Sequence, residues 1–411
     1  LDKLELTPEV CRHGSYKAAV EPYLMERRSP ENRLQTEVMT GTIWGQLLSE
    51  IATSRSIDSA SLQTYASRLT ISDAGTARNT GMVDSLAYRG DVDDLLCEMT
   101  GQEEEPLFVT LGEYIAQPRM AVDKLSKNKI AVVYAEGEIV DGGGGKEMVG
   151  GDDLADQLAR VRRDEEVKAV VLRINSPGGS ALAAEVVWHE MERLRAEKPV
   201  IVSMGDVAAS GGYYMAAPAD VILASPTTVT GSIGVFGLLL DASQGLKNKL
   251  GITVDGVKTN PSADMGTPFR AVSQAERDYI QQGVEQVYAT FVDHVAQGRN
   301  LSVPQVDSLA GGRVWSGVSA LQNGLIDAYG GLKEAILLAA DRAGVADDYR
   351  VSTPSVPGDR LGMILDMLSS RIGSPAFEGE LGEAFQQYGR LQRILSRQGV
   401  QALMPAEIRI E

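Results

Sequence analysis

The chain has 411 residues, of which 43% are hydrophobic and 23% are charged, a composition typical of a soluble globular protein with two or three domains. Its formal net charge of −17 argues against a nucleic-acid partner, because nucleic-acid-binding proteins need a basic surface. The two cysteines, Cys11 and Cys97, are too few for a disulfide framework and either pair or stay as free thiols. The sequence has no run of about 18 or more apolar residues, so we expect no transmembrane span in it.

A short strand and a long helix are predicted near the N-terminus. Val10–Arg12 forms the strand. Ser29, Pro30 and Glu31 are the N-cap, the first-turn proline and the first-turn acid of a helix that we expect to reach about Ser54. The apolar side chains spaced along this helix are expected to form its buried face: Leu34, Val38, Ile43, Leu47 and Ile51.

Several N-terminal segments have counterparts later in the chain. Leu1–Leu4 resembles Lys247–Leu250, Ser29 opens a helix as Ser273 does, and Asn79–Asp84 resembles Gln322–Asp327. The pairs are offset by 243 to 246 residues, a shared spacing that predicts a duplicated domain. The second copy begins near Lys129, so roughly 118 residues of the first copy are missing, and we expect a fragment or a processed product.

The repeat and the composition together predict four parts. They are the C-terminal part of the first copy (residues 1–100), a connector (101–128), the complete second copy (129–348), and a linker with a helical C-terminal tail (349–411). The connector carries an acidic run, which we interpret as a solvated loop, and a segment at 107–115 that forms a strand or a short helix.

In the tail, the proline-rich Ser352–Gly358 is predicted to be a linker. Two amphipathic segments follow it, Leu361–Arg371 and Leu381–Arg397. They make oligomer contacts or membrane-surface contacts, or they form a mobile tail.

The second copy alternates strands with helices, which predicts an α/β fold with a largely parallel sheet. The expected strands are Ile130–Tyr134, Ala169–Ile174, Val200–Ser203, Val221–Leu223 and Ile252–Val257, and two of the helices between them are Asp153–Val161 and Ala181–Glu197. A further helix opens with a capping box, Ser273 with Glu276, and its apolar face comprises Ile280, Val284, Val287, Phe291 and Val295. Gly142–Gly145 is a flexible loop, without the lysine and the spacing of a phosphate loop.

Ser210 lies at the centre of Gly205–Tyr213, between a short β-branched strand and a helix of small residues. A serine at a strand-to-helix turn exposes its hydroxyl while the first N–H groups of the helix point toward the group that it attacks. A second glycine loop, Asn175–Ser180, also follows a strand and leads into a helix. These two strand-to-helix turns would place backbone N–H donors and the Ser210 hydroxyl side by side.

Three motifs, Asn175–Ser180, Ala208–Tyr213 and Thr230–Val235, closely resemble the catalytic domain of the signal peptide peptidase A family of serine proteases, peptidase family S49. The resemblance implies a Clp protease/crotonase-like α/β fold, tandemly duplicated here with an incomplete first copy. Ser210 matches the nucleophile of that family, and Ser232 matches the serine that orients its lysine base.

The family resemblance also supplies a base and an oxyanion site. Gly14–Pro22 resembles the segment that holds the catalytic lysine, which places the base at Lys17. The oxyanion donors implied are the N–H groups of Gly178 or Gly179 and of Gly211. No metal or cofactor is implied.

Other mechanisms and classes remain open on the sequence. A Ser-His-Asp triad would need one of the three histidines, His13, His189 or His294, and none occupies the position that a Clp protease triad requires. A crotonase-like acyl-CoA enzyme and an inactive scaffold or assembly protein are the rival functions.

The resemblance implies a serine endopeptidase that degrades cleaved signal peptides and other hydrophobic peptides. It also implies a homo-oligomer, a tetramer, at the bacterial inner membrane with its sites facing the periplasm, attached through a segment absent from this chain. Ile233, Val235, Phe236 and Leu238 are expected to line an apolar groove.

Overall fold

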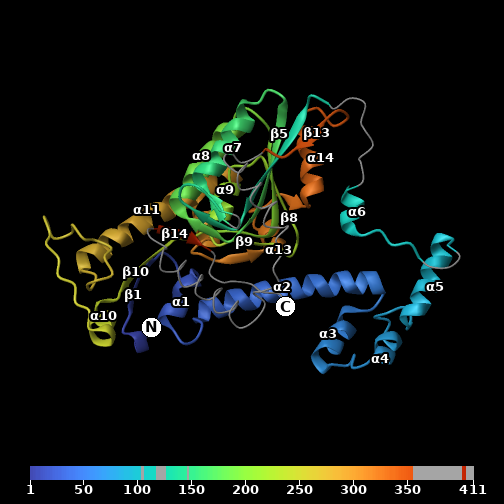
Figure 1. Ribbon diagram of the computed structural model, residues 1–411, viewed down its shortest axis with the longest axis horizontal. Coiled ribbons are helices and arrows are strands. Elements are labelled where there is room, and N and C mark those ends of the chain that lie inside the picture. The colour runs from blue at the N-terminus through green and yellow to red at the C-terminus, as the bar shows by residue number, and fades with distance from the viewer. Residues whose placement is uncertain (103–105, 117–125, 146–147, 355–399, 404–411) are drawn as a thin grey trace. The chain divides into compact units, whose positions relative to one another are not determined.

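The computed structural model describes residues 1–102, 106–116, 126–145, 148–354 and 400–403 (Figure 1). These residues form two compact units: unit 1 contains residues 1–40 and 126–411, and unit 2 contains residues 41–125. The long helix α2 (Pro30–Arg55) starts in unit 1 and ends in unit 2. The division into duplicated copies stays a prediction.

Unit 1 is built on an eight-stranded sheet with the order β11-β9-β7-β5-β2-β13, in which β8 also pairs with β7 and β12 pairs with β8. Its strands are β2 (Lys129–Glu136), β5 (Val167–Ser176), β7 (Val200–Ala209), β8 (Val221–Ala224), β9 (Val229–Gly231), β11 (Val314–Ser316), β12 (Ala328–Tyr329) and β13 (Arg350–Ser352). β11 runs antiparallel to β9, and the other described pairs are parallel. The central strands are nearly all apolar because helices cover both faces, as parallel sheets require.

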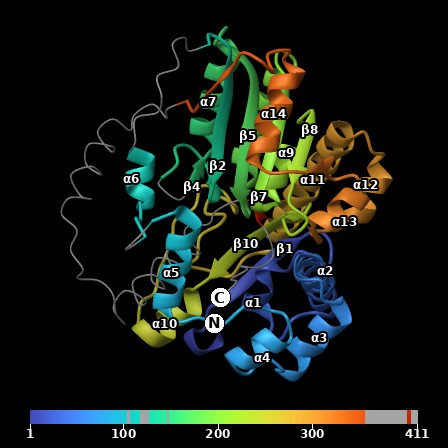
Figure 2. The same ribbon diagram turned by 90° about the vertical axis from the view of Figure 1, so that its right-hand side faces the viewer.

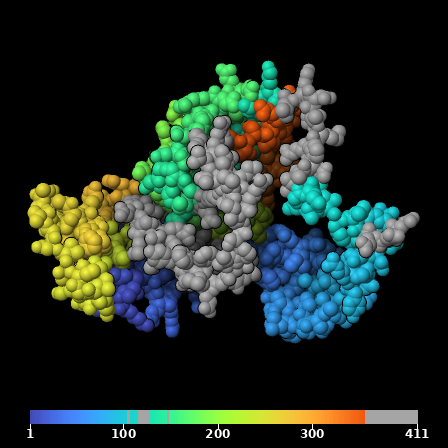
Figure 3. Space-filling model, viewed as in Figure 1, coloured from blue at the N-terminus to red at the C-terminus, as the bar shows by residue number. Residues whose placement is uncertain are grey.

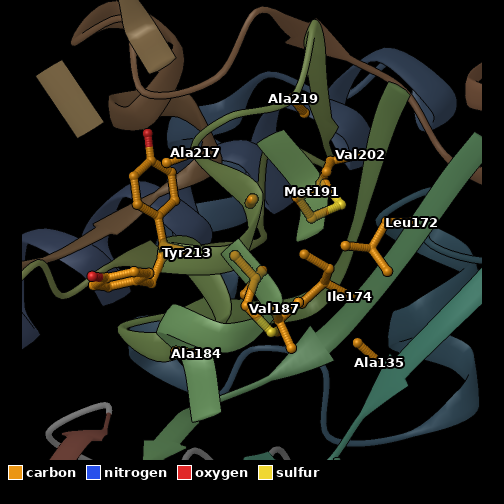
Figure 4. Close-up of a cluster of buried hydrophobic side chains, with 14 of the residues drawn as sticks. Ala135, Leu172, Ile174, Ala184, Val187, Met191, Val202, Tyr213, Ala217 and Ala219 are labelled. Atoms are coloured by element: carbon orange, nitrogen blue, oxygen red, sulfur yellow. The ribbon is translucent and has the colours of Figure 1, made fainter. Parts of the chain in front are cut away.

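Alternate residues of the central strands face two separate cores. Ala131 and Val133 of β2 point toward the helices α7 (Gly151–Arg163), α8 (Ala181–Arg195), α9 (Gly211–Ala216) and α11 (Gln274–Arg299). Ile130 and Val132 pack against α14 (Leu332–Arg342) on the opposite face. Figures 1 and 2 show this three-layer arrangement, and Figure 4 shows Leu172 and Ile174 of β5 beside Val187 and Met191 of α8.

A second, six-stranded sheet brings distant parts of the chain together in the order β1-β10-β14-β6-β3-β4. Its strands are β1 (Thr7–Arg12), β3 (Glu138–Val140), β4 (Met148–Gly150), β6 (Gly178–Ser180), β10 (Phe236–Asp241) and β14 (Val400–Leu403). β1 pairs antiparallel with β10 over its whole length, from Thr7 opposite Asp241 to Arg12 opposite Phe236. This pairing places the start of the segment that follows β1 beside the start of β10.

The remaining helices of unit 1 are short. They are the 3-10 helices Asp2–Leu4 and Ala18–Val20, α1 (Glu21–Leu24), α10 (Ser243–Leu250), α12 (Val303–Leu309) and α13 (Gly317–Gln322). Residues 243–272, α10 and the loop after it, lie at the surface of the unit (yellow in Figure 3). Unit 2 contains α3 (Ser59–Arg68), α4 (Ala74–Asn79), α5 (Arg89–Thr100) and α6 (Leu111–Ala116).

Most expected elements are confirmed, including the four strands from Ile130 to Leu223 and both helices between them. Ser273 and Glu276 form the expected capping box of α11, and Val284, Phe291 and Val295 of its apolar face are buried. The segment at 107–115 contains a helix, α6. Both cysteines are free thiols.

Two expectations are wrong. Ile252–Val257 is irregular and exposed, not a strand, since the described residues provide no partner strand beside it. On α2, Leu34 and Val38 are 46% and 39% exposed, whereas Gln35 and Met39 are buried. The buried Gln35 amide is hydrogen-bonded to backbone groups of Tyr16 and Val314.

The tail segments Leu361–Arg371 and Leu381–Arg397, and most of Ser352–Gly358, lie outside the described residues. Within the part of the chain that the structure describes, no helix is both long and apolar enough to cross a membrane.

Candidate active site

Ser210 occupies the turn between the last residue of β7 and the first residue of α9. Its backbone has φ 55° and ψ −116°, a conformation rarely adopted by residues other than glycine. The surroundings hold it there: its N–H donates to Gly231 O at 2.8 Å, and its carbonyl accepts from Tyr214 N at 2.8 Å. Strain of this kind persists at functional sites because the neighbouring structure enforces it.

Lys17 reaches Ser210 from the segment that follows β1. Its Nζ lies 2.8 Å from Ser210 Oγ, 3.0 Å from Ser232 Oγ and 3.2 Å from Ser232 O. Lys17, Ser210 and Ser232 are all 0% exposed. These partners are all uncharged, so the protonated amine has no counter-ion among them.

Burial lowers the pKa of the Lys17 amine well below its ordinary value of 10.5. The physical cause is desolvation, since an ammonium ion loses its hydration when it is enclosed among neutral groups. A neutral amine can take a proton from a hydroxyl within hydrogen-bonding distance, and a lowered pKa increases the fraction of the amine that is neutral at a given pH. The pair therefore has the geometry of a nucleophile and its general base.

Ser232 is held in place by the loop that precedes β11. Its N–H donates to Arg313 O at 2.7 Å, and its hydroxyl donates to Gly312 O at 3.3 Å. Because that hydroxyl proton is directed at Gly312, the oxygen lone pairs of Ser232 remain available to an N–H of Lys17. The geometry is that of an orienting group.

Two glycines allow the backbone to pack closely against the segment that carries Lys17. A Cβ on Gly312, which has φ 85°, would lie 2.6 Å from Lys17 Cβ, and a Cβ on Gly14 would lie 2.5 Å from Gly311 Cα. Neither contact tolerates a side chain. Gly312 was not among the site residues expected from the sequence; its adjacency to Gly311 was the only available signal.

The three expected oxyanion residues occupy two neighbouring elements. Gly178 and Gly179 form β6, and Gly211 is the first residue of α9, which packs against β6. Gly178 has φ 97°, and its N–H donates to Ser176 Oγ at 3.2 Å. The N–H of Gly211 is one of the first four of its helix, which have no intrahelical acceptor.

An extended segment of the chain itself lies beside these glycines. β14 runs antiparallel to β6, with Leu403 opposite Gly178 and Ala402 opposite Gly179, and it pairs with β10 on its other side. The backbone edges of β6 and β10 therefore accept an extended peptide between them, directly at the expected oxyanion residues.

The histidines have other partners. His13 stacks on Tyr288 and its Nδ1 lies 2.6 Å from Glu285 Oε2. His294 stacks on Trp188 and pairs with Glu185, and His189 is exposed. Among the described residues, the side-chain hydrogen bond of Ser210 is made to Lys17.

Gln35 is a site residue that the sequence did not reveal. It is 1% exposed, and its amide bonds both to the backbone beside Lys17 and to the backbone of β11. A glutamine between Leu34 and Thr36 of a helix carries no local signal for this role.

Known proteins resemble this chain over most of its length. A family model described as peptidase family S49 matches residues 1–103 and 192–346. The chain is 37% identical over 383 residues to Protease 4 of Haemophilus influenzae, covering 90% of this chain and 62% of that protein. It is 30% identical over 411 residues to the chloroplastic serine protease SPPA of Arabidopsis thaliana, covering 98% of this chain and 60% of that protein. The chain thus spans about three fifths of the length of these relatives.

A putative protease of Methanocaldococcus jannaschii is 35% identical over 232 residues, which cover 55% of this chain and 74% of that protein. Among solved structures, a ClpP1 mutant from Listeria monocytogenes matches with a TM-score of 0.34 and 14% identity, covering 50% of this chain and 94% of that one. The α/β fold of the Clp protease/crotonase type, implied by the motifs, agrees with the family match. Because the family model covers more than half of its residues, this chain belongs to peptidase family S49.

Proposed function

We propose that this chain is a serine peptidase in which Ser210 is the nucleophile and Lys17 is the general base. The observation that carries the proposal is the 2.8 Å approach of Lys17 Nζ to Ser210 Oγ inside a fully buried site. A serine hydroxyl is a weak nucleophile at neutral pH and needs an adjacent base. The lowered pKa of Lys17 makes its amine suitable for that task.

In the first half-reaction, the neutral amine of Lys17 takes the hydroxyl proton as Ser210 Oγ attacks the carbonyl carbon of the peptide. The oxyanion that forms accepts hydrogen bonds from the N–H of Gly178 or Gly179 and from the N–H of Gly211. The lysine ammonium then gives its proton to the departing amine nitrogen, and the C–N bond breaks. An acyl ester on Ser210 remains.

In the second half-reaction, Lys17 takes a proton from a water molecule that attacks the ester carbonyl. Collapse of this intermediate breaks the bond to Oγ, which regains its proton from Lys17, and a carboxylic acid product leaves. Ser232 keeps the amine directed at Ser210 in both steps through its hydroxyl and carbonyl oxygens.

The proposed substrates are hydrophobic peptides in extended conformation, including cleaved signal peptides. The strand β14 supports the extended conformation, because it pairs with β6 and β10 as a substrate strand would. A relative from Enterococcus faecium, 37% identical over 216 residues, is named a putative signal peptide peptidase, which supports the substrate class. Around the proposed groove, Ile233, Val235 and Phe236 are buried apolar residues.

We also propose a homo-oligomer associated with the bacterial inner membrane, facing the periplasm. The bacterial relatives named Protease 4 support a bacterial setting. Size-exclusion chromatography with light scattering would measure the oligomer directly, and a monomer would contradict this part of the proposal.

Covalent labelling tests the function. A fluorophosphonate probe should modify the wild-type chain at Ser210, identified by peptide mass spectrometry, and should not modify Ser210→Ala. Lys17→Ala should be labelled far more slowly while it keeps its fold. Labelling that is unchanged in Ser210→Ala would contradict the proposal, and turnover of acyl-CoA thioesters by the unlabelled chain would favour the crotonase-like alternative.

A further inference from the structure

We infer that Gln35 is a positioning residue for Lys17, acting through the backbone on both sides of the lysine pocket. The inference rests on the proposed role of Lys17 as the base. Gln35 does not touch Ser210. It lies on the first part of α2, within unit 1, one helical turn after the residues that start the helix.

The side-chain amide of Gln35 joins two segments that are far apart in the sequence. Its Nε2 donates to Tyr16 O at 3.1 Å, in the residue directly before Lys17. Its Oε1 accepts from Val314 N at 3.2 Å, at the start of β11. β11 in turn pairs with β9, with Val314 opposite Gly231, the residue before Ser232. One buried amide therefore ties the lysine segment to the pair of strands β9 and β11, directly before Ser232.

The chemistry of the two contacts requires a glutamine. One partner is a carbonyl that needs a donor, and the other is an N–H that needs an acceptor, so both ends of the amide are used. Gln35 is 1% exposed, and removal of its amide takes the acceptor from the buried N–H of Val314 and a donor from the partly buried carbonyl of Tyr16. A side chain of the same length without hydrogen-bonding groups would fill the space but lose the connection.

Gln35 is itself fixed by a polar cluster at the start of α2. Its Nε2 also approaches Asn32 Oδ1 at 3.4 Å, and Asn32 Nδ2 donates to Glu21 Oε2 at 2.8 Å. Ser29 Oγ donates to Glu21 Oε1 at 2.5 Å, and Glu21 is only 3% exposed. These hydrogen bonds connect the start of α2 to α1, which follows the lysine segment directly in the chain.

The same segments meet in a second, independent contact. The guanidinium of Arg313 lies over the rings of both Tyr16 and Trp315, 5.2 Å and 4.2 Å from their centres. Tyr16 N also donates to Gly311 O at 3.2 Å. With these contacts present, loss of the Gln35 amide should loosen the segment without detaching it. Lys17 would then gain mobility and water, and the desolvation that lowers its pKa would weaken.

The experiment compares Gln35→Met with Gln157→Met, the same substitution at another glutamine of unit 1 that is 7% exposed. The pH dependence of kcat/KM is measured on one fluorogenic peptide, together with KM and the melting temperature. For Gln35→Met we expect the pH of half-maximal activity to rise by about one unit. At pH values well below that midpoint, kcat/KM should fall about tenfold, since the neutral amine fraction there falls tenfold for each unit by which the pKa rises, with little change in KM. Gln157→Met should keep the wild-type profile.

Activity lost by Gln35→Met at an unchanged half-maximal pH would overturn the inference, because a merely structural role lowers the amount of active enzyme at every pH alike. If Gln35→Met does not fold, Gln35→Asn takes its place, because it keeps the amide on a shorter side chain. Its pH of half-maximal activity should rise by less than one unit. A wild-type pH profile for Gln35→Asn would overturn the inference equally. Lys17→Ala in the same assay separates the two hypotheses. If it remains active, the proposed function fails; if it is inactive while both Gln35 variants keep the wild-type profile, only the role of Gln35 fails.

Discussion

Lys17 Nζ and Ser210 Oγ lie 2.8 Å apart in space although 193 residues separate them in the chain. The pairing of β1 with β10 and the amide of Gln35 bring the two groups together. Both side chains are fully buried, so their contact combines hydrogen-bonding geometry with the desolvation that a neutral lysine needs.

Lys17→Met should make the protein inactive and more stable. The lysine is protonated in the unfolded chain and loses its proton readily in the fold, so burial costs about 1.4 kcal/mol for each unit by which its pKa is lowered. This cost is absent above pH 10.5, grows as the pH falls toward the lowered pKa, and is constant below it. Denaturant unfolding at several pH values should show Lys17→Met gaining more stability at neutral pH than near pH 10.5. A variant less stable than wild type at neutral pH would contradict the desolvation argument.

Activity should rise with pH, with an apparent pKa well below the ordinary 10.5 of lysine, because the neutral amine is the active form. Lys17→Arg should be inactive at every accessible pH, since arginine keeps its proton. The alanine variants of His13, His189 and His294 should retain activity and the same pH profile. A histidine variant that is inactive while Lys17→Ala remains active would replace the lysine by a histidine mechanism.

Ser232→Ala should lower kcat without abolishing it. The substitution removes the hydroxyl that accepts from Lys17 at 3.0 Å but leaves the carbonyl contact at 3.2 Å. We expect a loss of about tenfold to a hundredfold, smaller than the loss on removing the base, whose contribution is about 10²–10⁴. Steady-state kinetics measures it, and unchanged turnover with an unchanged pH profile would exclude Ser232 from the site.

Gly312→Ala should abolish activity, because its Cβ would lie 2.6 Å from Lys17 Cβ. Gly344→Ala is the matched control: both glycines have positive φ, 85° and 68°, but a Cβ on Gly344 meets nothing within 4 Å. The two variants should therefore share the backbone strain, of about 1 kcal/mol or somewhat more, and differ in activity. Equal activities in a peptidase assay would show that the close approach to Lys17 is unimportant.

Removal of residues 400–411 should raise the activity toward small peptides several-fold. β14 pairs with Gly178 and Gly179 on one side and with β10 on the other, so it occupies the edges that a substrate strand would use. Removal of residues 404–411 alone, which leaves β14 in place, is the control and should change the activity less. Progress curves on one fluorogenic peptide measure both, and equal activities would mean that β14 does not compete with substrate.

The sequence alone was sufficient for features that depend on neighbouring residues. The alternation of apolar strands with helices, the capping box of Ser273 with Glu276 and the strand-to-helix turn at Ser210 are local patterns, and all three are present in the structure. The motif resemblance also directed attention to Lys17, Ser210 and Ser232, which the fold brings within hydrogen-bonding distance. Local periodicity and turn chemistry act over a few residues, so they can be recognised without the fold.

Only the tertiary structure decided which segments meet. Gln35 is buried while Leu34 and Val38 are exposed, because two backbone partners from distant segments converge on its amide. Likewise, Ile252–Val257 has the composition of a strand but no described neighbour to pair with. The crowding at Gly312 and the insertion of β14 between β6 and β10 depend equally on long-range contacts. Such contacts form only when chain segments far apart in sequence pack together, and no local pattern encodes which partner each segment will find.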